Sequence, residues 1–211
     1  DADLALNNAR VTWAPLVCVA LQCEFGQLGT GGHGMLRPIQ IPPLPATWDR
    51  YDATTSRLAG GRLLPQPDYV FCLLGTNDYQ QLEGGRNRLM DITGAYVGWL
   101  EAMRKACPQS AIFCITPPLG WHAAEIIAAV ETRRTAGDRQ VYLVDTAPLR
   151  DKFVAVDVDP VTREFSIVPA PTQLAGDGVH PTVYGNAVLA AFIAAEVSRQ
   201  LPADSTVERM P

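Results

Sequence analysis

Short apolar runs alternate with longer segments of helical periodicity along most of this 211-residue chain. The clearest run covers residues 69–74; it follows a proline-rich stretch and is ended by Gly75. This alternation is typical of parallel β-strands that are joined by crossover helices. The sequence therefore predicts the α/β class, as a three-layer α/β/α sandwich around a mostly parallel sheet.

The remaining elements are expected from the same pattern. We expect strands at residues 23–28, 69–74, 111–116 and 141–145. We expect one helix to end at residue 21 and others to cover 87–106, 123–134 and 181–200. Residues 48–58 are expected to be short helical or irregular, and 154–160 to form an extended excursion or a short hairpin.

The composition favours one domain. With 47% apolar residues, the chain can bury a substantial core. We expect a single domain over residues 1–201, followed by a poorly ordered tail at 202–211.

Charge and hydropathy exclude some classes of partner. The net charge is −5 and no Lys/Arg run occurs, which disfavours a nucleic-acid partner. No apolar stretch reaches the roughly 18 residues that a membrane span requires. No charged and then apolar leader opens the chain, although a mature secreted protein would have lost one. A secreted and a cytoplasmic location of a soluble protein therefore both stay open.

The cysteines do not form a recognisable framework. They are odd in number, lie in apolar surroundings and show no CxxC spacing: Cys18, Cys23, Cys72, Cys107 and Cys114. This pattern argues against both a disulfide framework and a zinc site, and it favours small buried core residues. We expect neither a metal nor a cofactor.

Asp177 and His180 lie near the end of the chain, within Asp-Gly-Val-His-Pro. A carboxylate three residues before a histidine can hold one ring nitrogen, so that the other nitrogen takes a proton from a serine hydroxyl. The same segment also fits an acidic turn that begins a helix, because Pro181 favours the first helical position. Both interpretations stay open on this motif alone.

Two further segments follow expected strands. Gly75-Thr76-Asn77-Asp78 comes after 69–74, and a glycine-rich stretch at 29–34 comes after 23–28. In parallel α/β sheets, ligands gather outside the carboxyl ends of the strands, which is where these segments would lie. Alternatively, the first is a turn with a helix cap, and the second is a flexible turn or a phosphate cradle, although it lacks the GxxxxGK[ST] pattern.

Together these segments resemble the sequence blocks of the SGNH (GDSL-type) hydrolases, a family of esterases and lipases. The matching segments are 75–78, 177–180 and the glycine block at 28–32, and the resemblance extends from about Trp13 to Leu201. It implies a flavodoxin-like SGNH hydrolase fold. It also implies that His180 is the general base, that Asp177 orients it, and that the Asn77 amide and the Gly32 N–H form the oxyanion hole.

The chain departs from this family in one block, because it contains no Gly-Asp-Ser. None of its serines lies in a strand-to-helix turn before the glycine block: Ser56, Ser110, Ser166, Ser198 and Ser205. The family pattern places the nucleophile at or just before the start of the chain. We expect either that the first strand with its serine is missing, or that Asp1-Ala2 derives from Asp-Ser; a natural pseudoenzyme is a third possibility.

The resemblance implies a serine ester hydrolase that removes small acyl groups, such as acetyl from carbohydrate, through an acyl-enzyme intermediate. The alternatives are an acyltransferase that uses the same site and a noncatalytic ligand-binding domain on this fold. Tyr79, Trp121 and His122 are candidate pocket residues, although ordinary loop aromatics fit the sequence equally well.

Overall fold

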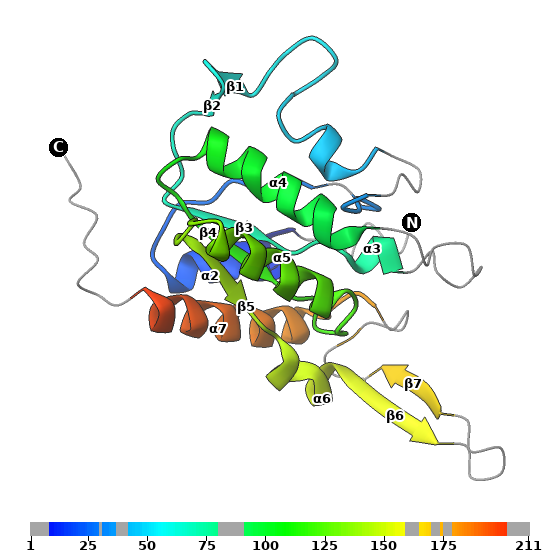
Figure 1. The fold of residues 1–211 in the computed structure, drawn as a ribbon. Helices are drawn as coiled ribbons and strands as arrows, with labels where there is room; N and C mark the ends of the chain where they lie inside the picture. Colours follow the sequence, from blue (N-terminus) through cyan, green and yellow to red (C-terminus); the bar gives the residue numbers. More distant parts are fainter. Residues whose placement is uncertain are drawn as a thin grey trace. The chain divides into compact units, whose positions relative to one another are not determined.

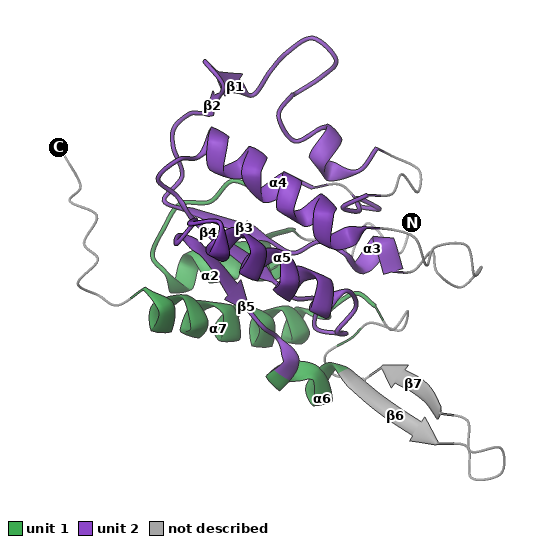
Figure 2. Ribbon diagram, in the orientation of Figure 1, with its two compact units in different colours: residues 1–27, 148–211 green, residues 28–147 purple. Residues whose placement is uncertain are grey.

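The computed structural model describes residues 9–29, 31–36, 42–79, 91–158, 165–169, 174 and 179–201. The chain divides into two compact units, one of residues 28–147 and one of residues 1–27 with 148–211 (Figure 2). Each unit is described separately below.

The unit 28–147 contains a parallel sheet in the order β3 (Tyr69–Cys72), β4 (Ala111–Ile115) and β5 (Val141–Val144), drawn in Figure 1. Phe71 lies opposite Phe113, which lies opposite Tyr142. The rings stack with centroid distances of 5.3 and 5.0 Å. This aromatic ladder follows directly from the strand sequences, because residues in register project from the same face.

Helices α4 (Ile92–Ala106) and α5 (Ala123–Thr135) pack on each other and on the opposite face of the sheet. The strand residues on that face include Cys72, Ile112 and Cys114, which join one core with apolar residues of both helices. Tyr96 of α4 is fully buried and donates a hydrogen bond to the Leu74 carbonyl at 2.7 Å. The helix is therefore attached to the end of β3 by a polar contact as well as by packing.

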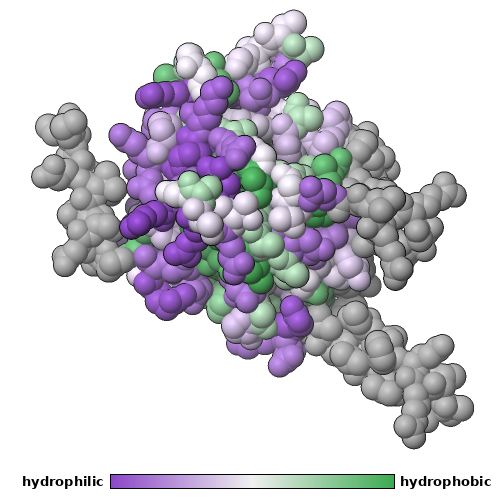
Figure 3. Space-filling model, in the orientation of Figure 1, coloured by the Kyte–Doolittle hydropathy of each residue, from purple (hydrophilic) through white to green (hydrophobic). Residues whose placement is uncertain are grey.

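Smaller elements complete this unit. They are η2 (Leu44–Ala46), the antiparallel pair β1 (Leu58–Ala59) and β2 (Arg62–Leu63), and the short helix α3 (Thr76–Tyr79). Gly60 and Gly61 both have positive φ, which is what the two-residue turn between β1 and β2 requires. On the face of α4 and α5 seen in Figure 3, hydrophobic residues form small, scattered patches among hydrophilic ones.

The unit of 1–27 and 148–211 is built on two helices, α2 (Trp13–Ala20) and α7 (Val183–Gln200), which pack together. The short elements η1 (Ala9–Val11) and α6 (Arg150–Phe153) belong to it. The sequence passes from one unit to the other within η4 (Ala147–Leu149). The strands β6 (Val154–Val158) and β7 (Phe165–Pro169) pair antiparallel.

The predicted α/β class and parallel sheet are confirmed, as are the strands expected within 69–74, 111–116 and 141–145 and a hairpin that begins at 154. The strand expected at 23–28 is wrong, because the structure assigns no strand there. Residues 24–29 are exposed, and Glu24, Gly26 and Gln27 interrupt the apolar positions. Four of the five cysteines are buried, as expected, whereas Cys23 is only half-buried.

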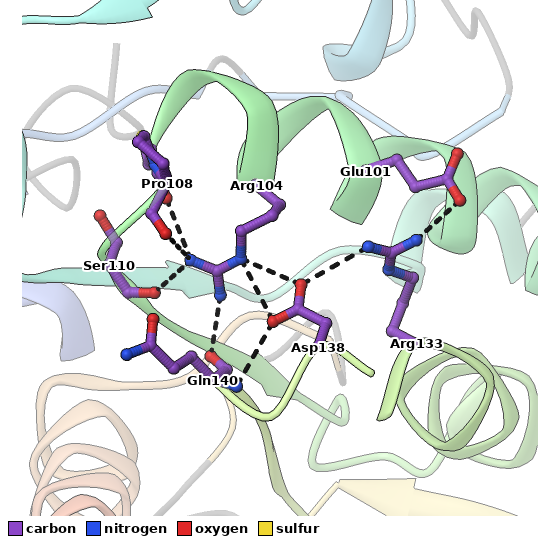
Figure 4. Close-up of polar contacts among 8 residues, drawn as sticks. Glu101, Arg104, Pro108, Ser110, Arg133, Asp138 and Gln140 are labelled. Atoms are coloured by element: carbon purple, nitrogen blue, oxygen red, sulfur yellow. Dashed lines mark hydrogen bonds and ion pairs between the residues drawn. The ribbon is translucent and has the colours of Figure 1, made fainter. Parts of the chain in front are cut away.

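Arg104 joins the C-terminal end of α4 to the start of two strands (Figure 4). Its guanidinium donates to the carbonyl oxygens of Cys107, Pro108, Ser110 and Gln140 at 2.7–3.2 Å. Its Nε lies 3.0 Å from Oδ2 of Asp138, whose side chain is 8% exposed. Ser110 and Gln140 immediately precede β4 and β5, so one planar cation fixes where both strands begin.

Replacing Arg104 should destabilise the fold more than its partly exposed position suggests. We expect Arg104→Ala to lower the free energy of unfolding by about 2–4 kcal/mol, because it leaves carbonyl groups without a donor and removes the nearer of the two cations beside the buried carboxylate of Asp138. Arg104→Lys should lose most of the same stability, since it keeps the charge but not the planar fork. Urea unfolding measures both variants.

The exposed Arg134 on α5 is the matched control. Arg134→Ala should change the free energy of unfolding by less than about 0.5 kcal/mol. An unfolding midpoint of Arg104→Ala equal to that of Arg134→Ala would contradict the role given to Arg104.

Candidate active site

The carboxyl end of β3 leads directly into the Gly-Thr-Asn-Asp segment. Gly75 has a φ of +118°, a conformation that side chains other than glycine rarely adopt, and it turns the chain from the strand into α3. Asn77 and Asp78 of this short helix both bond to the loop of residues 31–36. Two segments far apart in the sequence are therefore joined at this edge of the sheet.

Asp78 holds together the two segments 31–36 and 76–79, which are called the corner below. Its side chain is fully buried, and its carboxylate accepts hydrogen bonds from the backbone N–H groups of Met35 at 2.7 Å and Leu36 at 2.9 Å. Hydrogen bonds from backbone N–H groups to an ionised carboxylate are short and strong. Asp78 thus fixes the conformation of the loop, a role that the sequence reading did not assign to it.

Asn77 contacts the same loop at His33, which lies between Gly32 and Gly34. Its Nδ2 donates to the carbonyl oxygen of His33 at 2.8 Å. A side-chain amide has two N–H bonds, so this contact orients the group and leaves the second hydrogen for another acceptor. The residue bonded by Asn77 directly follows Gly32.

Gly32 has a backbone conformation that favours glycine. Its φ is +88°, and a Cβ placed there would meet no atom within 4 Å, so only the backbone conformation restricts this position. Among the residues that the structure describes, no acceptor is found for its N–H. The two expected oxyanion donors, Gly32 and Asn77, therefore come from one hydrogen-bonded corner of the unit 28–147.

His180 and Asp177 belong to the other unit. His180 is exposed and lies just before the N-terminus of α7, whereas Asp177 lies outside the described residues. The segment after His180 is held by Asn186, whose Nδ2 donates to the carbonyls of Pro181 and Thr182 at 3.0 Å. The Oδ1 of Asn186 accepts from the Trp13 N–H at 2.9 Å.

Asn186 is thus a positioning residue that the sequence reading missed. It is 8% exposed and ties the start of α7 to the start of α2. A polar residue among the apolar positions of a predicted helix is the signal that could have indicated such a role.

Aromatic rings gather just beyond Asn77. Tyr79 stacks on Trp121 with a centroid distance of 4.7 Å and an interplanar angle of 12°. The His122 ring meets Tyr79 edge-on at 5.7 Å, and its Nδ1 lies 3.4 Å from Glu125 Oε1. His122 adopts the left-handed conformation with a φ of +54°, which is uncommon for a non-glycine residue. Of the three, Tyr79 is clearly exposed, at 40%.

Two kinds of feature are absent from the part of the chain that the structure describes. No group of three or more His, Cys, Asp or Glu side chains suited to hold a metal ion occurs in that part of the chain. Within the same residues, no helix has the length and apolar character to cross a membrane.

Removing the charge of Asp78 should loosen the loop that carries Gly32. We expect Asp78→Asn to weaken the two N–H contacts, because one carboxylate oxygen becomes a donor, at a cost of about 1–3 kcal/mol. Hydrogen–deuterium exchange at the Met35 and Leu36 amides should then be about tenfold faster or more. The control is Asp52→Asn, which alters a carboxylate that accepts hydrogen bonds in an exposed turn of the same unit. Unchanged exchange at both amides would show that Asp78 does not hold the loop.

The close packing of the loop on Asp78 gives a second test. A Cβ on Gly34 would lie 2.8 Å from Oδ1 and 3.0 Å from Cγ of Asp78, a buried group that is already hydrogen-bonded. We expect Gly34→Ala to lower the free energy of unfolding by about 1–3 kcal/mol through overpacking. Gly31→Ala, in the same loop but with no atom within 4 Å of the new Cβ, should be near neutral in thermal unfolding. Equal effects of the two substitutions would contradict the packing argument.

Comparison with known proteins shows which fold this is. No protein-family model matches the chain. It is 22% identical over 205 residues to the cellulase/esterase CelE of Acetivibrio thermocellus, a match that covers 92% of this chain and 22% of that protein.

Two solved structures share its architecture over most of its length. One is a family two carbohydrate esterase from Clostridium thermocellum in complex with cellohexaose: TM-score 0.62, 20% identity, covering 92% of this chain and 55% of that one. The other is the acetyl xylan esterase Est2A from Butyrivibrio proteoclasticus: TM-score 0.62, 17% identity, covering 92% and 56%.

The chain thus spans about a fifth of the curated relative and little more than half of these solved chains. At such identities the likeness is one of fold. The resemblance predicted from the sequence motifs is confirmed at that level: the chain has the SGNH-type α/β fold of carbohydrate esterases.

Proposed function

We propose that this chain is the core of a serine ester hydrolase that removes small acyl groups, such as acetyl, from carbohydrate. The observation that carries the proposal is the corner in which Asn77 bonds to the His33 carbonyl while Asp78 fixes the following residues of the loop. This arrangement supports two N–H donors of fixed orientation, one from the Asn77 side chain and one from the Gly32 backbone. Fixed donors are the principal requirement for stabilising the oxyanion of acyl transfer.

In the proposed mechanism, a serine hydroxyl attacks the acyl carbonyl while His180 accepts its proton, with Asp177 orienting the imidazole. The negative charge that develops on the carbonyl oxygen is bound by the Asn77 amide and the Gly32 N–H. Collapse of the tetrahedral intermediate releases the sugar hydroxyl, which receives the proton from His180. Water then attacks the acyl-enzyme while His180 accepts its proton, and His180 returns that proton to the serine oxygen as the acid is released.

A carbohydrate substrate is favoured by two independent observations. The relatives are named as a cellulase/esterase and an acetyl xylan esterase, and one solved structure holds cellohexaose. Within this chain, the Tyr79–Trp121 stack begins two residues after Asn77 and leaves Tyr79 partly exposed. Aromatic rings have an apolar face and, in Tyr and Trp, a polar edge, which suits the apolar face and hydroxyl rim of a sugar.

A noncatalytic carbohydrate-binding role is the second candidate, and one observation favours it. None of the five serines of the chain lies in a strand-to-helix turn before the glycine block. Such a domain would keep the aromatic surface and bind oligosaccharides without releasing an acyl group. An acyltransferase would instead pass the acyl group to a second alcohol.

The test is acetate release from acetylated xylan and from p-nitrophenyl acetate. The test uses two proteins: residues 1–211, and a longer protein that also carries the residues encoded before Asp1. In the version that contains the nucleophile, Asn77→Ala should lower kcat by about 10²–10³-fold, because one oxyanion donor is lost. His180→Ala should lower it by about 10²–10⁴-fold, because the general base is lost.

Arg134→Ala is the control, since its side chain is exposed in the last turn of α5. Turnover that survives His180→Ala would remove His180 as the base. Oligosaccharide binding by calorimetry without turnover in either version would support the binding domain, and acyl transfer to added alcohol in preference to water would support the transferase.

A further inference from the structure

The C-terminal end of α2 has a specific capping geometry. The N–H of Cys23 donates to the Cys18 carbonyl at 2.9 Å, and the N–H of Gln22 donates to the Val19 carbonyl at 3.2 Å. Gln22 between them is in the left-handed conformation, with a φ of +55°. These nested bonds and the left-handed residue define a Schellman motif.

In this motif, the residue after the left-handed position folds back onto the last full turn of the helix. The two positions whose side chains meet are those joined by the outer hydrogen bond, and here both are cysteine. Burial, and next the contact with the Cys23 thiol, raise the pKa of Cys18 to about 11. The two thiols therefore lie in contact at the C-terminal end of the helix.

The two thiols differ in access to solvent. Cys18 is 8% exposed, whereas Cys23 is half-buried and can be reached from outside. Cys72 and Cys114 are also neighbours, because they lie in register on β3 and β4, but they are 4% and 0% exposed within the core. Only the pair at the end of α2 combines proximity with an accessible member among the described cysteines.

We propose that Cys18 and Cys23 are a disulfide site, which an oxidant of the disulfide class, such as glutathione disulfide, converts to a covalent staple across the C-terminus of α2. The thiolate of Cys23 attacks one sulfur of the oxidant, forming a mixed disulfide and releasing one glutathione. The thiolate of Cys18 then attacks the Cys23 sulfur and releases the second glutathione. Two thiol protons and two electrons leave the protein, and they are recovered in the two glutathione molecules.

The surroundings indicate a lasting staple and not a reactive redox centre. Catalytic cysteines sit where the thiolate is stabilised, for example at a helix N-terminus. This pair lies at a helix C-terminus, where the partial negative charge disfavours a thiolate, and Cys18 is also buried. A thiolate that is poorly stabilised is a poor leaving group, so the disulfide should resist reduction once it has formed.

The folded protein is incubated with glutathione disulfide, its remaining thiols are blocked, and it is digested with trypsin. The peptide 11–50 contains Cys18 and Cys23 and no other cysteine, because the only internal arginine, Arg37, precedes Pro38, a bond that trypsin leaves intact. We expect this peptide to lose two hydrogen atoms in mass and to carry no blocking group. Cys72, Cys107 and Cys114 should react with the blocking reagent only after unfolding.

Variants separate the proposed geometry from simple proximity. Gln22→Gly keeps the left-handed position and should form the disulfide at the wild-type rate. Gln22→Val, a β-branched residue that is disfavoured at positive φ, should form it about tenfold more slowly. Oxidation should raise the Tm of the wild type, because the disulfide restricts the unfolded chain. In Cys18→Ser, Cys23 should stop at the mixed disulfide, and this rise in Tm should be absent.

Three results would overturn the proposal. They are an unoxidised peptide 11–50, a wild-type protein that stops at the mixed disulfide on Cys23, and a Gln22→Val variant that closes the disulfide as fast as Gln22→Gly. Because none of these readouts measures ester hydrolysis, they are independent of the proposed function.

Discussion

The buried carboxylate of Asp78 is the interaction on which the candidate site depends. It accepts the N–H groups of Met35 and Leu36, so the glycine-rich loop takes one conformation where Met35 enters the core. Asn77, its neighbour on α3, bonds to the same loop at His33. An oxyanion hole needs donors that are already in place before charge develops, and here the element that carries one proposed donor also fixes the loop that carries the other proposed donor.

The elements with the strongest apolar patterns could be predicted from the sequence. Residues 69–74 are a run of apolar side chains between clear breakers, and β3 forms there; the helix expected over 87–106 contains α4. The strand expected at 23–28 fails because its two large apolar residues, Phe25 and Leu28, are exposed and separated by glycine and glutamine. Local periodicity signals a strand only where a neighbouring strand pairs with it.

The site was predictable in part, and for a physical reason. The position of Asn77 after an apolar run correctly placed it beyond the end of β3, and its bond to His33 joins it to the glycine-rich loop, although the strand expected before Gly32 does not form. The roles of Asp78 and Asn186 were not predictable, because each depends on contacts with residues distant in the sequence. Asp177 lies outside the described residues, so its role stays a prediction.

Arg104 binds the chain where β4 and β5 begin, while Asn77 and Trp121 lie beyond the opposite ends of β3 and β4. The Arg104 clamp and the groups proposed to contact a ligand are thus set apart by the length of the sheet. Loops at the ligand edge can be exchanged or lengthened while the guanidinium clamp remains untouched. A scaffold divided in this way can change what it binds at one edge while the contacts of Arg104 stay in place at the other.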